Sequence, residues 1–185
     1  MIASQSPRML LVPALLLAVV AGDGLAAGGA PAPVPAVLDV PAGQVLTLTA
    51  HGVGVQIYQC AANPQDPGNF SWTLKAPEAT LRSPSGKKLG THYAGPTWEA
   101  PDGSKVVGEL VAKADSPDAT AIAWLLLRAK ATSGSGVFAA VSSIQRLRTV
   151  GGKAPAGGCD AAHAGRETRI RYSAEYRFYA APGGQ

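Results

Sequence analysis

The chain has 185 residues, of which 22 are Gly, 15 are Pro and only 2 are Cys. This length predicts one domain that can bury enough surface to fold without a metal or a dense disulfide framework. The glycines have no three-residue period, which excludes collagen, and 15% charged with 46% hydrophobic residues, at a net charge of +4, argues against wholesale disorder.

The N-terminal residues 1–26 are typical of a secretory signal peptide. Arg8 supplies its positive charge, and the apolar run over residues 9–21 is too short for a comfortable membrane span. Small residues up to Ala26 predict cleavage before Ala27; an uncleaved anchor is the alternative. We therefore expect a secreted or periplasmic protein without stable membrane insertion.

The mature chain is predicted to contain a flexible Ala/Gly/Pro arm over residues 27–36, a β domain over 37–181 and a tail over 182–185. Apolar residues in the domain follow a period of two, which indicates strands, and no amphipathic helical stripe is present. The predicted strands cover residues 45–50, 53–60, 70–75, 96–100, 105–113, 121–127, 137–147 and 168–179.

The turns between these strands follow from residue type. His51-Gly52 predicts a turn between the first two strands, and residues 63–69 and 83–88 are rich in turn formers. Asp102-Gly103 is the strongest hairpin signal, because Gly readily adopts the positive φ that a tight turn needs. An irregularity is expected near Ser142-Ser143.

Two of the strands carry informative patterns. Residues 121–127 are apolar at every position, which favours a central strand covered on both faces. In the last strand, alternate residues are predicted to point inward: Ile170, Tyr172, Ala174, Tyr176 and Phe178. With about eight or nine short antiparallel strands, the sequence predicts an all-β, single-domain β-sandwich or closed β-barrel, expected to be a monomer.

The cysteines form an even pair, and in an oxidising compartment Cys60 and Cys159 are expected to join. Two free thiols or a two-cysteine metal site are the alternatives. His163 follows Cys159 at a ligand-like distance, but Cys60 has no such neighbour, and His51 and His92 show no ligand spacing. No metal and no other cofactor is predicted.

The stretch from His92 to Ser104 is the candidate ligand-binding site, because it places aromatic, acidic and imidazole side chains around one hairpin. Aromatic rings would provide flat faces for a sugar, and the polar groups would bind its hydroxyls. The alternative is structural, with a core Trp and an Asp that serves the turn. The candidate residues are His92, Tyr93, Trp98, Glu99 and Asp102, and if the protein were an enzyme, Glu99, Asp102 and His92 would be catalytic.

Basic residues concentrate towards the C-terminus, with nine basic and three acidic residues from position 128 onward. A solvated strand face is the simpler explanation; the other is an anion-binding patch. On that face only Tyr179 would stack on bases, so no nucleic-acid partner is predicted. The patch would contain Arg146, Arg148, Arg169, Arg171 and Arg177.

Several motifs together resemble one family, the secreted bacterial and fungal proteins grouped as domain of unknown function 3455 (DUF3455). The resemblance covers about residues 36–180 and implies that Cys60 and Cys159 belong to the family pattern. No functional residue is established for this family, so the resemblance assigns none here. The motifs are VQIYQC at 55–60, HYAGPTWE at 92–99, DGS at 102–104, WLLL at 124–127, IQR at 144–146 and YRFY at 176–179.

Three functions are consistent with these features. The first is a non-enzymatic binding module for carbohydrate or a cell-envelope component. The second is a hydrolase or small-molecule enzyme that uses the hairpin from His92 to Ser104. The third is a structural or stress-related envelope protein without a ligand.

Overall fold

The structure, a computed structural model, describes Met1 and residues 31–183. The predicted signal peptide, apart from Met1, lies outside the described residues, as do residues 27–30 of the predicted arm. The strands are β1 (Val45–Asn63), β2 (Asp66–Arg82), β3 (Lys88–Tyr93), β4 (Thr97–Glu99), β5 (Lys105–Ala114), β6 (Trp124–Ser133), β7 (Val141–Gly151) and β8 (Glu167–Ala180), with 3-10 turns η1 (Ala36–Leu38) and η2 (Ala161–His163).

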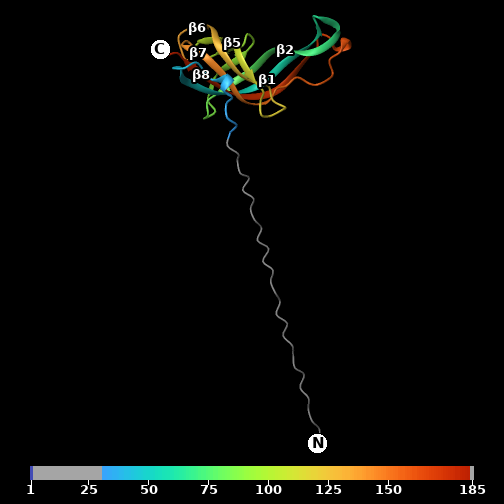
Figure 1. Cartoon of the computed structure of the whole chain (residues 1–185), viewed down its shortest axis with the longest axis horizontal. Helices are drawn as coiled ribbons and strands as arrows, with labels where there is room; N and C mark the ends of the chain where they lie inside the picture. The colour runs from blue at the N-terminus through green and yellow to red at the C-terminus, as the bar shows by residue number, and fades with distance from the viewer. Residues whose placement is uncertain (2–30, 184–185) are drawn as a thin grey trace. The chain divides into compact units, whose positions relative to one another are not determined.

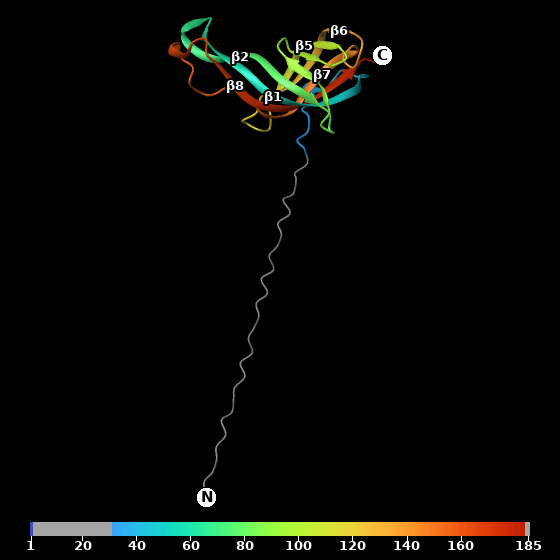
Figure 2. The ribbon, with the colours of Figure 1, turned by 180° about the vertical axis from the view of Figure 1, so that it is seen from behind.

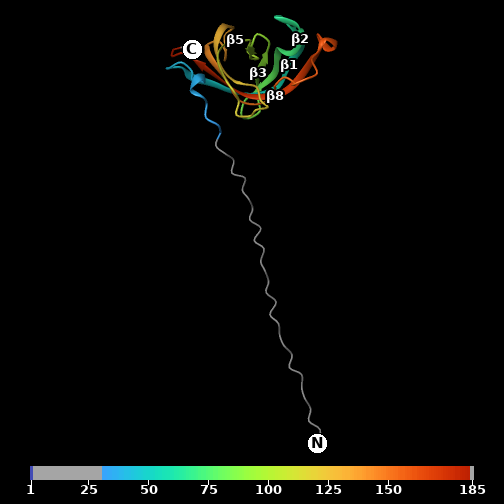
Figure 3. The ribbon, with the colours of Figure 1, turned by 45° about the vertical axis from the view of Figure 1, so that its right-hand side comes forward.

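The strands form one closed antiparallel barrel in which each strand pairs with its neighbour in sequence and β8 pairs with β1 (Figure 1). Of the two architectures predicted from the sequence, the structure has the barrel. Figure 3 shows the strands curving around a common interior. The alternation in β8 is confirmed, because Tyr172, Ala174, Tyr176 and Phe178 are buried at every second position.

The interior is filled by aromatic and aliphatic side chains. Trp98 from β4 lies edge-on to both Tyr176 and Phe178 of β8, with ring centroids 5.6 and 6.0 Å apart. Phe138 packs on Phe178 at 4.8 Å, and aliphatic side chains from β2, β5, β6 and β7 fill the rest. Such burial of large apolar side chains is the main favourable contribution to folding.

The predicted turn at His51-Gly52 is wrong, because β1 runs through it as one strand of 19 residues. Gly52 has a packing role. A Cβ there would lie 2.6 Å from the Tyr176 ring, so only glycine leaves room for that ring in the barrel. Gly54 does the same for the β2 backbone, where a Cβ would lie 2.0 Å from the Glu78 carbonyl oxygen.

The hairpin prediction at Asp102-Gly103 is confirmed, since the turn joins β4 to β5 and Gly103 has φ of 84°. The irregularity predicted near Ser142-Ser143 is also present as a register shift between β7 and β8. Two predicted strands begin too early. The structure starts β6 at Trp124 and β7 at Val141.

Strand β6 is covered on both faces, as its uniformly apolar sequence predicts. Leu125 and Leu127 contact the barrel interior, whereas Trp124 and Leu126 point outward. Leu38 of η1 covers them there and is fully buried. Ala32 and Val34, which belong to the segment predicted as an arm, pack against the same outer cluster.

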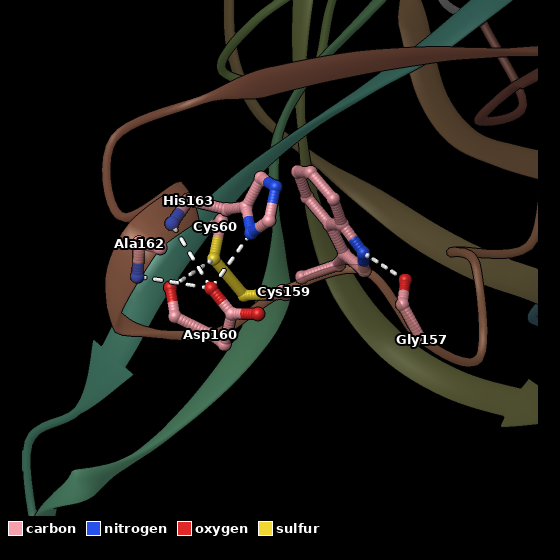
Figure 4. Close-up of polar contacts among 7 residues, drawn as sticks. Cys60, Gly157, Cys159, Asp160, Ala162 and His163 are labelled. Atoms are coloured by element: carbon pink, nitrogen blue, oxygen red, sulfur yellow. Dashed lines mark hydrogen bonds and ion pairs between the residues drawn. A yellow bond between two sulfur atoms is a disulfide. The ribbon is translucent and has the colours of Figure 1, made fainter.

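Strands β1, β2 and β8 are longer than their neighbours and continue past the short strands (Figures 1 and 2). The β7–β8 connection is attached to this extension by a disulfide between Cys60 and Cys159, with 5.4 Å between their Cα atoms. Figure 4 shows the disulfide beside Asp160, whose carboxylate accepts from the backbone N–H groups of Ala162 and His163. Trp72 Nε1 donates to the Gly157 carbonyl.

Candidate binding site at the barrel mouth

A pocket of about 260 Å³ opens at the barrel end that carries the β3–β4 turn. Its walls come from β1, β2, β3, β6, β7 and that turn, so strands on opposite sides of the barrel meet there. Apolar residues form most of the lining. Of its four polar residues, Lys75 is exposed at the rim, and the other three are less exposed. The lining residues are Gln56, Leu74, Lys75, Ala76, Pro77, His92, Gly95, Pro96, Leu125 and Arg146.

Gln56 is the first polar group of this pocket. It lies on the inward face of β1 and is 1% exposed. Its amide nitrogen lies near the Tyr172 hydroxyl but makes no full hydrogen bond within the described chain. A buried amide without a partner costs about 1–3 kcal/mol, so this donor is available to a ligand acceptor.

His92 is the second polar group. Its ring stacks on Trp98 at 4.4 Å, and its Nδ1 lies 2.9 Å from the Thr97 carbonyl oxygen. Because a carbonyl only accepts, the proton is on Nδ1 and Nε2 is an acceptor. Burial lowers the pKa of His92 to about 3, so the ring is neutral at physiological pH.

Arg146 is the third polar group, and it faces the barrel interior. It pairs with Leu125 of β6 and Tyr176 of β8, both of which contact the core. Directly opposed residues in antiparallel strands share a face, so the Arg146 side chain lies on the same side as these two. Its Nε and Nη2 donate to the Ala123 carbonyl at 3.2 and 2.8 Å.

Three tyrosines surround this cluster and remain neutral. Burial raises the pKa of Tyr58 and Tyr172, and it raises that of Tyr176 well above its usual value. The positive charge of Arg146 opposes the shift in each case. The Tyr58 hydroxyl donates to the Gly152 carbonyl at 2.7 Å, and the Tyr172 and Tyr176 hydroxyls are 3.1 Å apart.

The structure divides the site predicted at the hairpin. His92 and Trp98 have their rings in the barrel interior, with 2% and 1% exposure. Tyr93 and Glu99 lie on the outer surface, where the Tyr93 hydroxyl donates to Glu99 at 2.6 Å. The rings of Tyr93 and Trp98 therefore lie on opposite sides of the sheet and do not form one platform.

The two carboxyls proposed for catalysis have separate roles. Asp102 accepts from the Ser104 N–H and hydroxyl and from the Val137 N–H, which lowers its pKa. The Tyr93 hydroxyl and then Lys105 lower the pKa of Glu99. Neither carboxyl has the raised pKa that a general acid needs.

The predicted arginine patch is also divided. Arg148 and Arg177 both pair with Glu175, at 2.7 and 2.6 Å. Arg169 pairs with Glu78 at 2.7 Å, and Arg171 lies exposed on the outside. Arg146 alone of the five lines the barrel-mouth pocket.

Sequence reasoning therefore finds two of the three polar groups, His92 and Arg146, in separate candidate sites and misses Gln56. One signal was available for Gln56. It stands among β-branched and aromatic residues at an inward position of the strand, where a polar side chain is unusual.

Fold and site together define a small closed β-barrel with a mostly apolar pocket at one end that carries a few polar groups. A family model described as "Protein of unknown function (DUF3455)" matches residues 41–180. The chain belongs to this family. Comparisons with curated proteins and with solved structures gave no match. In the part of the chain that the structure describes, no helix is long and apolar enough to cross a membrane.

Proposed function

We propose that the protein is a secreted, non-enzymatic binding module for carbohydrate or another envelope component, and that its ligand occupies the barrel-mouth pocket. The observation that carries the proposal is the buried Gln56 amide, which lines an open pocket and whose nitrogen makes no full hydrogen bond within residues 31–183. The acceptor of a ligand bound in the pocket would satisfy this donor.

The pocket lining suits a small polar ring. Pro77, Pro96 and Leu125 supply apolar walls, and Gln56 and His92 offer one donor and one acceptor. Ligand sites combine such apolar walls with a few fixed polar groups. A volume of about 260 Å³ suits one sugar-sized unit better than a chain of several.

Export is part of the proposal, and the disulfide supports it. Disulfides form and persist in oxidising compartments and are rare in the cytosol. The bond between Cys60 and Cys159 therefore agrees with the predicted signal peptide. The carboxyls of Glu99 and Asp102, with lowered pKa values and protein partners, support binding over hydrolysis.

The test replaces Gln56 with Met, which keeps the side-chain volume and removes the amide. Wild type should bind a member of an array of neutral and acidic saccharides, and Gln56→Met should weaken that binding at least tenfold in calorimetry. The variant should be as stable as wild type or more stable by about 1 kcal/mol, because an unpartnered buried amide is lost.

Two matched variants serve as controls. Gln59→Met, on the same strand outside the pocket, should bind as wild type does. Gln145→Met should destabilise by about 1–3 kcal/mol, because the Gln145 amide donates to the Leu38 carbonyl and accepts from Tyr179. No saccharide bound by wild type, or equal binding by Gln56→Met, would leave the structural envelope protein as the better explanation.

A further inference from the structure

Of the two cationic residues that line the pocket, Arg146 has no acidic partner in the described part of the chain. Within residues 31–183 no carboxylate lies in ion-pair distance of Arg146, whereas Arg148, Arg169 and Arg177 each pair with a glutamate. Arg146 is half-buried, and an arginine partly withdrawn from water usually has such a partner, because removing a charge from water is costly. The Ala123 carbonyl accepts from two of the five N–H groups that a guanidinium carries, and the Tyr176 hydroxyl also lies near the guanidinium. The remaining N–H groups are the donors that a ligand would use.

The neighbours of Arg146 do not compensate its charge. Its field acts on Tyr58, His92, Tyr172 and Tyr176, all of which are neutral at physiological pH. At the rim, the charges of Lys75 and Glu167 neutralise each other, so neither compensates the charge of Arg146. The mouth of the barrel therefore holds one uncompensated positive charge beside apolar walls.

The donors and acceptors of the pocket restrict the ligand further. Arg146 and Gln56 both offer N–H donors, and a guanidinium binds a carboxylate through two parallel hydrogen bonds. His92 Nε2 is an acceptor, because the ring proton is on Nδ1, which donates a hydrogen bond to the Thr97 carbonyl. A ligand that satisfies all three groups has an anionic group and a neighbouring hydroxyl.

We infer that the pocket selects a small hydroxy acid, with the carboxylate on Arg146 and Gln56 and a hydroxyl donating to His92. The inference rests on the proposed function: a hydroxy acid that is also a carbohydrate is a sugar acid, which is the class of ligand we expect. Two sources share this chemistry: a free sugar acid, and the terminal uronate of a polysaccharide.

The experiment compares glucuronate and galacturonate with glucose and galactose by calorimetry at one ionic strength. A charge-assisted hydrogen bond contributes more than a neutral one, so the acids should bind about ten- to a hundredfold more tightly. Arg146→Gln should abolish this preference, and Arg146→Lys should reduce it, because lysine lacks the planar fork. Arg171→Gln, at an exposed arginine outside the pocket, should leave it unchanged.

The outcomes separate the two proposals. Equal affinity for acids and neutral sugars, with binding lost in Gln56→Met, would overturn the sugar-acid inference and keep the binding function. If none of the four sugars binds, the sugar-acid inference is overturned. If, in addition, Gln56→Met weakens the binding of no saccharide on the array, the proposed binding function fails as well. If Arg146→Gln does not fold, the affinity of the wild-type protein for the two acids relative to the two neutral sugars still tests the inference.

A final arm distinguishes the two sources. A galacturonate trimer that binds as tightly as the monomer indicates capture of a polysaccharide end. A trimer that does not bind, beside a monomer that does, indicates a free sugar acid.

Discussion

His92 is a buried titratable residue enclosed by aromatic rings. Its ring stacks on Trp98, with Tyr176 5.1 Å away, and Arg146 is the charged group that acts on it. Burial is the main cause of the lowered pKa, the bond to Thr97 opposes it, and the Arg146 charge adds to it. Protonation of His92 would thus place a second positive charge in the same interior.

This burial predicts a pH dependence of stability. The pKa of His92 is about 3 in the folded protein, against 6.5 for an ordinary histidine. Between these values the unfolded state binds more protons, so stability is fully present above pH 6.5 and falls as the pH drops towards 3. The slope from this one group is up to about 1.4 kcal/mol per pH unit.

The measurement is urea unfolding of wild type and His92→Phe at pH 4, 5, 6 and 7. Phenylalanine keeps a ring against Trp98 and cannot be protonated. The variant should show a flatter dependence, even though it loses the bond to the Thr97 carbonyl. Parallel curves for the two proteins would show that His92 is not the group responsible.

Arg146 and Arg148 are two residues whose faces of the sheet could not be predicted from the sequence. Two residues apart in a regular strand, they would share a face. The pairing of β7 with β8 shifts between Leu147 and Val150, and Arg148 has φ of 48°. This bulge places Arg148 beside Glu175 outside the barrel and leaves Arg146 inside. The positive φ depends on tertiary pairing, which no local pattern reveals.

At the scale of elements, the segment before β1 acts as a cover for the outer face of the barrel. Leu38 of η1 is fully buried among Trp124, Leu126 and Leu147. Its carbonyl also accepts from Gln145 Nε2 at 2.7 Å. Without this cover, two strands would expose an apolar face to water.

Leu38→Ala should therefore lower the free energy of unfolding by about 2–5 kcal/mol, the range for truncating a buried leucine. Val37, the adjacent residue, is 58% exposed, so Val37→Ala should change it by less than about 0.5 kcal/mol. Denaturant titration of both variants measures the difference. Similar values for the two substitutions would mean that η1 contributes little to the stability of the barrel.

Two elements that depend on neighbouring residues were predicted well, whereas the turn-rich residues 63–69 lie mostly in β1 and β2, and features that depend on distant residues were not predicted. The Asp102-Gly103 hairpin follows from two residues, and the apolar run at 121–127 from its own composition. The turn predicted at Gly52 fails because the Tyr176 ring, far along the chain, requires a glycine there. The pocket could not be predicted, because five strands contribute its walls.

At the scale of the whole molecule, barrel closure and the disulfide connect the beginning of the domain to its end. Strands β1 and β8 pair from Val45 to Gln59 along β1, and Cys60 follows at the end of this pairing. The disulfide closes a sequence separation of 99 residues, so it restricts the unfolded chain more than the folded one. Cys60 also exchanges backbone hydrogen bonds with Gly165 and Arg166.

The double variant Cys60→Ala, Cys159→Ala should fold into the same barrel with an unfolding free energy lower by about 4–5 kcal/mol, the chain-entropy value for so long a loop. Ligand affinity should be unchanged, because neither cysteine lines the pocket and the β1–β8 pairing remains. Calorimetry and urea unfolding measure the two quantities, and wild type kept reduced should match the variant. A stability loss with weakened binding would instead show that the disulfide shapes the pocket through the extension of β1, β2 and β8.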